Sequence, residues 1–465
     1  MSRRAVVIGA GVAGMLAAAA LSATVDEVIV LDRDELPDGP GPRKGLPQGR
    51  HAHLLMAGGV AAMDDLAPGL DIRGRLLAAG AHEVSLATGM LALSPDGWHR
   101  RWRRPAPAMI TCTRGLLDWV VRSAVADRTG VEVRRAGAVG LLGDAGRVRG
   151  VRVSGPAGES ELAADLVVDG SGRGSRITTW LEDLGVSGLR ERTVDSGLVN
   201  ATRIYRVPPG AERFPLTMVQ PDPYASRPGR SAMVLPIEDG RWMVSLAGTR
   251  GGEPPADPEG FLGFALGLRD PIVGRLISGA EPLTDVYVSR STSNVRRYLE
   301  KARRWPEGLV VLGDALATFN PAYGQGMSVA ALGARALARE LRRAGPDAAG
   351  LSRRAQRAAA RPVETAWALA VGQDVLYPGV RGGRPGVADH LASAYSRRLT
   401  KAATGSHPAA AALWDLTSLR TGPARLLHPA ALLSVITGSP LPAATHPPLT
   451  AEERKLLTEL DVTGV

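Results

Sequence analysis

Three glycines and one aspartate near the N-terminus have the spacing of a nucleotide-binding turn. Gly9, Gly11 and Gly14 form a G-x-G-x-x-G pattern, and Asp32 follows about 20 residues later. Gly9 permits a tight turn, Gly11 lets the backbone approach a pyrophosphate, and Gly14 lets a helix pack closely on a strand. The carboxylate of Asp32 can accept hydrogen bonds from a ribose diol. These four residues predict a dinucleotide site.

The elements needed to position these residues are present in the sequence. Residues 5–8 form an apolar run typical of a buried parallel strand, residues 12–23 predict an Ala/Leu-rich helix, and residues 27–31 predict a second strand ending at Asp32. The helix N-terminus offers free N–H groups and partial positive charge to phosphates. The alternative is a secretory signal peptide, because a basic start (MSRR) precedes the apolar stretch. A cleaved peptide needs neither spaced glycines nor the second strand.

Two further strand–glycine–helix patterns occur later in the chain. A buried strand over residues 165–169 runs into a glycine-rich turn at 170–176, GSGRGSR. A strand over residues 308–312 is followed by Gly313 and Asp314, and a long Ala-rich helix begins near Gly326. An aspartate at this place can hold a ribityl hydroxyl, and a helix N-terminus can stabilise negative charge on a ring. The alternative is an ordinary strand-to-helix turn.

A Pro/Gly-rich loop over residues 37–47 places polar side chains near the predicted nucleotide site. It carries Arg43 and Lys44, and His51 and His53 follow it. Loops beside a ligand site often carry function, so we expect these side chains to contact the cofactor or the substrate. The alternative is a loop that only covers the strand ends. An apolar helix is expected to start near Leu54.

Arg114 lies in the first turn of a helix predicted over residues 111–124. A cation is unfavourable there by the helix dipole, which favours a partner anion such as a pyrophosphate. The alternative is a surface arginine.

Bulk composition excludes several classes of function. The 465 residues are long enough for two or three domains, and a hydrophobic content of 45% indicates a globular chain. The net charge of +10 comes with only 4% aromatic residues, which argues against nucleic-acid binding. A single cysteine excludes an internal disulfide and fits a reducing compartment. Without metal-ligand spacing or a membrane-spanning run, we expect a soluble cytoplasmic protein with no metal and no membrane or nucleic-acid partner.

Strand patterns separate the middle of the chain from its ends. Residues 131–153 predict a β-meander, and residues 84–104 predict short strands. From about residue 185, alternating segments at 197–207, 231–235 and 241–247 predict an antiparallel sheet in a domain of its own. The last 120 or so residues are Ala-rich and predict a helical cap.

Together, the three glycine turns near positions 9, 170 and 313, with a sheet inserted between them, resemble the flavin-dependent monooxygenases of the aromatic-hydroxylase type. The resemblance covers residues 4–345. It implies FAD as the cofactor and an α/β fold, in which a Rossmann-like FAD-binding domain carries an inserted antiparallel-sheet substrate domain and a helical C-terminal region. The implied boundaries are 1–183 and 286–345 for the two parts of the FAD domain, 184–285 for the sheet domain and 346–465 for the cap.

The resemblance also assigns roles to residues. The first three glycines and Asp32 would hold the ADP half of FAD, Arg33 would flank the adenosine, and Arg114 would reach the phosphates or the ribityl chain. Asp314 would bind the ribityl chain, and the backbone at Gly326 and Met327 would face the flavin pyrimidine carbonyl. The full implied cofactor set is Gly9, Gly11, Ala13, Gly14, Asp32, Arg33, Arg43, Lys44, His51, Arg114, Val139, Gly313, Asp314, Pro321, Gly324, Gly326 and Met327.

Two residues differ from the usual motifs of this family and indicate a subgroup of it. Ser171 stands where the usual middle motif has Asp, which puts direct use of NADPH in doubt, and Ser328 stands where many hydroxylases have Asn. With PQGRHAHLL at residues 47–55, these variants look closer to the polyether-antibiotic epoxidases of lasalocid and monensin type. That resemblance implies epoxidation of alkenes along a linear polyketide through a flavin C4a-hydroperoxide. O₂ would be consumed, and NAD(P)H would supply electrons directly or through a separate flavin reductase.

No catalytic side chain is named by the sequence, because such chemistry belongs to the flavin. Substrate-lining candidates on the predicted sheet are Met218, Met233, Met243 and Trp242, and core packing is the favoured alternative for most of them. The alternatives are an aromatic hydroxylase, a prenyl reductase of the same fold, and a flavin-bound protein without turnover. A halogenase is disfavoured because the sequence lacks a W-x-W-x-I-P segment.

Overall fold

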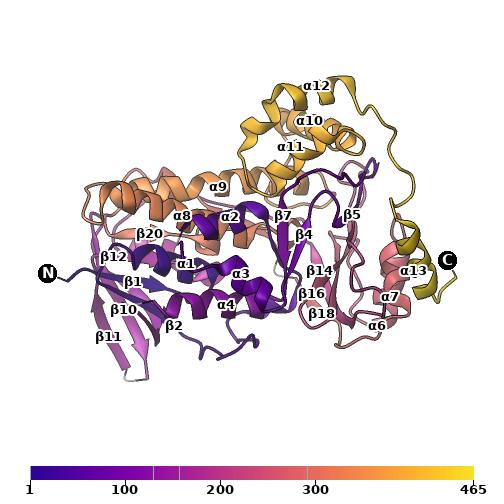
Figure 1. Ribbon diagram of the computed structural model, residues 1–465. Coiled ribbons are helices and arrows are strands. Elements are labelled where there is room, and N and C mark those ends of the chain that lie inside the picture. Colours follow the sequence, from indigo (N-terminus) through magenta and orange to yellow (C-terminus); the bar gives the residue numbers. More distant parts are fainter. Residues whose placement is uncertain (1, 67, 129, 157, 291, 465) are drawn as a thin grey trace.

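The computed structural model describes residues 2–66, 68–128, 130–156, 158–290 and 292–464, and Figure 1 shows its arrangement. One end of the molecule is built on a parallel sheet with strand order β20-β12-β1-β2-β8. Every neighbouring pair in it is parallel. Because both faces are covered by other elements, its central strands are almost continuously apolar. The bounds are β1 Arg4–Ile8, β2 Glu27–Asp32, β8 Val131–Arg135, β12 Leu166–Asp169 and β20 Leu309–Val311.

Helices pack on this sheet and on one another. The first helix packs against α4 and α8, and α9 packs against α8 and β20. Alanines fill the contact, because small side chains let helices approach closely; Ala17, Ala18, Ala331 and Ala334 are fully buried. The bounds are α1 Val12–Leu21, α2 Ala57–Leu66, α3 Ile72–Ala78, α4 Arg114–Ala126, α5 Ile177–Asp183, α8 Gly326–Ala344 and α9 Leu351–Asp374.

The predicted meander is shorter than expected at its start. Strands β9 Gly137–Gly143, β10 Val148–Gly155 and β11 Gly158–Ala163 form an antiparallel sheet. Residues 131–135 are instead the edge strand β8 of the parallel sheet, paired with β2. Alternation within one strand does not reveal its partner, and the partner here lies about a hundred residues away.

A seven-stranded sheet forms the other half of the molecule, with order β18-β14-β17-β16-β15-β5-β6. Two of its strands, β5 and β6, come from before residue 184, and β5 pairs in parallel with β15. The predicted boundaries 184–285 therefore leave part of this sheet out. The bounds are β5 Met90–Ser94, β6 Gly97–Trp98, β14 Val199–Arg206, β15 Leu216–Val219, β16 Arg230–Ile237, β17 Arg241–Gly248 and β18 Tyr287–Ser289.

The two faces of this sheet have different neighbours. One face packs on α6 Pro258–Leu266, α7 Ile272–Ser278 and α13 Ala451–Leu460, on the side away from the parallel sheet (Figure 1). The other face packs on a small sheet of β3 Leu54–Leu55, β7 Ala108–Thr111 and β4 His82–Ser85. The helix expected from Leu54 is wrong at its start, because Leu54 pairs with Thr111 and α2 begins at Ala57. A last small sheet contains β13 Glu191–Val194, β19 Asn294–Arg297 and β21 Ala317–Thr318.

The C-terminal residues do not form a single cap. Helix α9 belongs to the core of the parallel-sheet half, and α13 belongs to the core of the seven-stranded sheet. Only α10 Val387–Ala403, α11 His407–Thr417 and α12 Pro429–Thr437 form a bundle with its own small core (Figure 1). Over the ranges described above, no helix has the length and apolar character required to cross a bilayer.

Candidate functional site

The first two glycine turns are in direct contact. Gly9 has φ of 96°, and a Cβ atom on it would lie 2.8 Å from both Gly170 O and Ser171 Cα. A Cβ atom on Gly14 would lie 1.8 Å from Gly9 O, and one on Gly170 would lie 2.9 Å from Gly14 N. The turns after β1 and β12 are therefore packed backbone to backbone, which only glycine allows.

The third turn joins them at the same edge of the sheet. Gly313, with φ of 59°, follows β20, and a Cβ atom on it would lie 2.7 Å from Ala13 Cβ. The start of α8 comes close to the same turn, because a Cβ atom on Gly326 would lie 3.7 Å from Asp314 Oδ1. Since β1, β12 and β20 are neighbours, their carboxyl ends bring all three predicted turns together.

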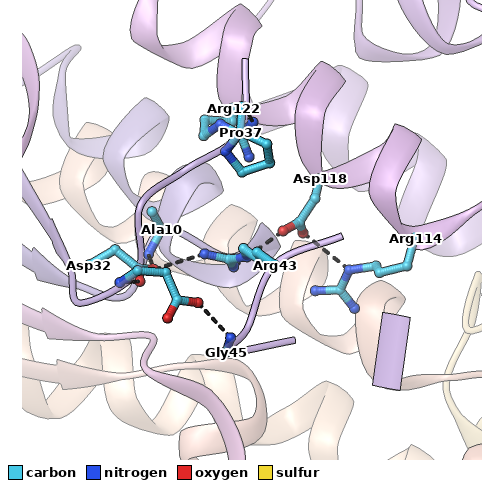
Figure 2. A network of polar contacts seen from close by, with 9 residues as sticks. Ala10, Asp32, Pro37, Arg43, Gly45, Arg114, Asp118 and Arg122 are labelled. Atoms are coloured by element: carbon cyan, nitrogen blue, oxygen red, sulfur yellow. Dashed lines mark hydrogen bonds and ion pairs between the residues drawn. The ribbon is translucent and has the colours of Figure 1, made fainter. Parts of the chain in front are cut away.

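Asp32 and Arg43 meet over the first turn (Figure 2). Asp32 Oδ2 accepts hydrogen bonds from Ala10 N at 2.8 Å and from Arg43 Nη1 at 3.0 Å. A Cβ atom on Gly11 would meet only Arg43 Nη2, at 3.5 Å. The guanidinium thus lies against the N-terminus of α1, the position at which a helix binds phosphate.

The network continues to α4 through Asp118. Arg43 Nη2 lies 3.2 Å from Asp118 Oδ2, and Arg114 Nε donates to Asp118 Oδ1 at 3.1 Å. The side chains of Arg43 and Asp118 are 7% and 4% exposed. Two carboxylates and two guanidiniums therefore alternate in a buried chain from Asp32 to Arg114 (Figure 2). The spacing of Arg114 and Asp118 is the i,i+4 spacing of a helical ion pair, and this signal could have identified Asp118 from sequence.

This network fits the pyrophosphate of a dinucleotide. Within the described part of the chain, the buried Arg43 Nε has no hydrogen-bond partner. A buried donor left unpaired is costly, and an anion bound at the glycine turn would satisfy it. Asp118 compensates the positive charge of Arg114, which the helix dipole disfavours at this position.

Arginine side chains from two other elements influence the pKa of Asp314. Burial raises the pKa of Asp314, while the charges of Arg114 and Arg173 lower it. Arg173 comes from the second glycine turn, where its Nη2 donates to Ser293 O at 3.4 Å. Sequence analysis did not single out Arg173, because an arginine in a glycine-rich turn has no distinctive spacing.

Ser171, which replaces the usual Asp of the middle motif, helps to stabilise the conformation of the second glycine turn. Its backbone N–H and its hydroxyl both donate to Asp169 Oδ1, at 2.9 and 2.6 Å, and the Ser175 hydroxyl donates to Asp169 Oδ2 at 2.6 Å. Asp169 is fully buried, and burial raises its pKa against the effect of these hydrogen bonds. No motif or spacing in the sequence predicts this role for Asp169.

Residues 37–53 form the cofactor loop, and His51 links this loop to the seven-stranded sheet. His51 is 6% exposed, and its Nδ1 lies 2.9 Å from Thr202 Oγ1 on β14. Burial, with a smaller effect of Arg50, lowers the pKa of His51 to about 4. Burial, with the charge of Arg114 next, lowers the pKa of His53 to about 3. Both rings are therefore neutral at pH 7.

A pH dependence of stability follows from His51. Its pKa is about 4 in the native state and about 6.5 in an unfolded chain. Between these values the unfolded chain binds a proton that the native state does not, so the free energy of unfolding falls as pH drops from 6.5 to 4. We expect His51→Gln to reduce the fall between pH 7 and pH 4.5 by about 2.4 kcal/mol. Denaturant titrations of both proteins at pH 7 and pH 4.5 measure the difference, and equal falls would contradict the assignment.

Other predicted cofactor residues lie at the margins of the network. Arg33 is exposed, and a Cβ atom on Gly137 in β9 would lie 3.8 Å from Arg33 Cβ. Val139 lies in the same strand. Lys44 and Pro321 are exposed, whereas Met327 is buried in the first turn of α8. The structure thus gathers most of the predicted set around the three turns and leaves Arg33 and Lys44 at the surface.

The sheet face toward the cofactor loop carries a row of uncharged side chains. Backbone pairing aligns Tyr287, Thr202, Ser245, Met233, Met218 and Ala92 across six strands. Paired residues point to the same face, and Thr202 fixes which face by its contact with His51. Met218 and Met233 are half-buried on it, as a lining role requires. Trp242 lies on the opposite face among the helices α6 and α7, so it is a core residue and does not line the substrate site, as the core-packing alternative predicts.

Comparisons with known proteins agree with this arrangement. No family model matches the chain. It is 32% identical over 401 residues to "Protein Rv3254" of Mycobacterium tuberculosis, covering 80% of both chains. It is 30% identical over 344 residues to the kynurenine 3-monooxygenase of Salinispora arenicola, covering 70% of both chains. The flavin-dependent brominase Bmp2 shares the fold, with a TM-score of 0.65 at 14% identity over 93% of this chain and 97% of that one.

Proposed function

The chain belongs to the family of FAD-dependent monooxygenases, and from that premise we propose that it epoxidises alkenes of a linear polyene or polyketide, as in polyether biosynthesis. The observation that carries this proposal is the uncharged row on the sheet face toward the cofactor loop. A row across six strands spans five inter-strand spacings of about 4.8 Å, or about 24 Å. Thr202 and Ser245 are buried, so the half-buried Tyr287, Met233, Met218 and Ala92 are the members that would line an extended chain.

The composition of the row supports an apolar substrate. Methionine side chains are flexible and polarizable, so Met218 and Met233 can adapt to an extended hydrocarbon chain. Ser245 and Thr202 add two hydroxyl groups, and the neutral His51 lies beside them. Both hydroxyls are buried and already hydrogen-bonded, Thr202 to His51 and Ser245 to Asn200, so this part of the row is polar but uncharged.

The residues around the glycine turns would hold FAD. We assign the ADP half to the three glycines and Asp32, the pyrophosphate to Arg43 and Arg114, and the ribityl chain to Asp314. Bound FAD, once reduced, supplies the oxygen chemistry. The protein's own part is to orient the alkene against the cofactor and to exclude water. Electrons would come from NAD(P)H, directly or through a separate flavin reductase, and the protein would work in the cytoplasm.

Aromatic hydroxylation is the second candidate, favoured by the kynurenine 3-monooxygenase relative. Kynurenine carries the ammonium and carboxylate charges of an amino acid. The six residues of the row carry no charge. Arg50 lies 4.7 Å from the centre of the Tyr287 ring and would pair with a carboxylate, but the row offers no anion for the ammonium, so we favour the apolar substrate. A prenyl reductase of the same fold would consume no oxygen.

Labelled oxygen distinguishes these functions. The FAD-loaded protein is incubated with a chemical reductant of free flavin, isotopically labelled O₂, and either a linear polyene acid or a phenol. Epoxidation is expected to place one labelled atom in the polyene and to leave the phenol unchanged. Labelled hydroxylation of the phenol alone would establish the second candidate, and reduction of the polyene without label would establish a reductase.

One variant tests whether the polyene binds on the proposed face of the sheet. Met233→Lys is expected to lower conversion of the polyene at least about tenfold, because a buried charge opposes an apolar ligand, while bound FAD remains unchanged. The control is Val387→Lys on α10, a position that is already 79% exposed. Equal conversion of the polyene by the two variants would show that the substrate does not bind on this face.

A further inference from the structure

A buried carboxylate at the end of α9 holds the loop between β21 and α8. Asp374 is 1% exposed. Its Oδ2 accepts hydrogen bonds from Asn294 Nδ2 at 2.7 Å and from Asn320 Nδ2 at 3.0 Å. Its Oδ1 accepts one from the Tyr323 hydroxyl at 2.9 Å. One side chain from the C-terminal region therefore gathers donors from β19 and from both ends of the 3-10 turn Pro321–Tyr323.

The same loop is fixed from a second direction by Asn294. Asn294 Oδ1 accepts a hydrogen bond from Asn320 N at 2.7 Å. Asn320 Oδ1 in turn accepts one from Ala322 N at 3.0 Å. The loop then turns at Gly324, with φ of 63°, and enters α8 at Gly326. Asp374 and Asn294 thus determine where the chain enters α8, beside Asp314.

The chemistry of Asp374 indicates more than packing. Burial raises its pKa, and hydrogen bonds from Asn320, Tyr323, Asn294 and Ser196 oppose that effect. Among the residues that the structure describes, no lysine, arginine or histidine forms an ion pair with it. A buried carboxylate without a cation costs free energy that an apolar side chain would not. An apolar residue cannot supply an acceptor for these four converging donors.

We propose that Asp374 is a positioning residue for the FAD site, holding residues 320–326 in the conformation that binds the flavin end of the cofactor. Helix α9 would thereby be part of the cofactor site, although its sequence carries no nucleotide motif. The inference concerns FAD binding alone, so it stands whether the substrate is a polyene or a phenol.

Asp374→Asn tests this role with little change in size. An asparagine retains one acceptor oxygen but places an NH₂ group against donors that need acceptors. We expect the Kd for FAD to rise about tenfold and the visible spectrum of the bound flavin to change, because the loop no longer fits the ring. The full-length chain is stripped of flavin and titrated with FAD, and quenching of flavin fluorescence gives the Kd.

The matched control is Glu364→Gln, which removes the same charge from the exposed face of the same helix. It is expected to leave the Kd and the flavin spectrum within twofold of the parent protein. Thermal unfolding of the flavin-free chain is measured for both variants. A purely structural Asp374 would lower the melting temperature and leave the Kd and the spectrum of the folded fraction unchanged, and that result would overturn the proposal.

A milder variant covers the case in which Asp374→Asn does not fold. Tyr323→Phe removes one of the donors to Asp374 and keeps the ring in place. We expect it to raise the Kd for FAD by about two- to fivefold and to change the spectrum in the same direction. A Kd and a spectrum identical to those of the parent protein would contradict the role assigned to this cluster.

Discussion

Replacing Gly14 with alanine is expected to abolish FAD binding. The new Cβ atom would lie 1.8 Å from Gly9 O and 3.2 Å from Val7 Cγ1. The alanine side chain would collide with the backbone of Gly9 inside the first turn, so α1 must move away from β1. That movement opens the glycine turn and removes the N-terminus of α1 from the phosphates.

The expected effect is a loss of FAD affinity of at least 100-fold, or about 2.7 kcal/mol. Overpacking should also lower the free energy of unfolding by about 1–3 kcal/mol. Flavin absorbance per chain after purification measures the first effect, and denaturant unfolding measures the second. The control is Gly263→Ala in α6, where a Cβ atom meets nothing within 4 Å; it should retain FAD and gain about 0.5–1 kcal/mol. A Gly14→Ala protein that is purified with full flavin content would refute the packing argument.

Replacing Arg43 with alanine is expected to have the second-largest effect. Arg43 lies between Asp32 and Asp118, and its side chain is 7% exposed. Its removal leaves Asp118 buried with Arg114 as its remaining partner. Breaking a buried ion pair by removing one partner typically costs about 3–5 kcal/mol. The variant also loses the guanidinium that lies against the N-terminus of α1.

We therefore expect the Kd for FAD to rise about 100-fold and the free energy of unfolding of the flavin-free chain to fall as well. Arg135→Ala is the control, because it removes the same charge from a pair that is 61% and 81% exposed. An exposed pair contributes about 0–1 kcal/mol, so this control should bind FAD normally. Double replacement, Arg43→Ala with Asp118→Asn, should recover part of the lost stability, because it removes the uncompensated carboxylate. Equal FAD affinity of Arg43→Ala and Arg135→Ala would exclude Arg43 from the site.

The three glycine turns, the cofactor class and the α/β fold could be predicted from the amino-acid sequence. These are local patterns: a strand, a turn and a helix lie within about 30 residues, and glycine is required where backbones touch. Gly9, Gly14 and Gly313 could be identified for that reason, and so could Asp32 at the end of its strand. The flavin monooxygenase family was confirmed by its relatives, whereas epoxidation of a polyketide stays a prediction.

The residues that complete the site from distant parts of the chain could not be predicted, because tertiary packing brings them there. Asp118 reaches Arg43 because α4 packs on α1, and Asp374 reaches residues 320–323 because α9 packs beside β19 and β20. Trp242 and Met243 are adjacent in sequence yet lie on opposite faces of the sheet. Alternation indicates that two faces exist, but the packing of other elements determines which one meets the cofactor. These relations depend on contacts between segments far apart in the chain, which periodicity and spacing do not encode.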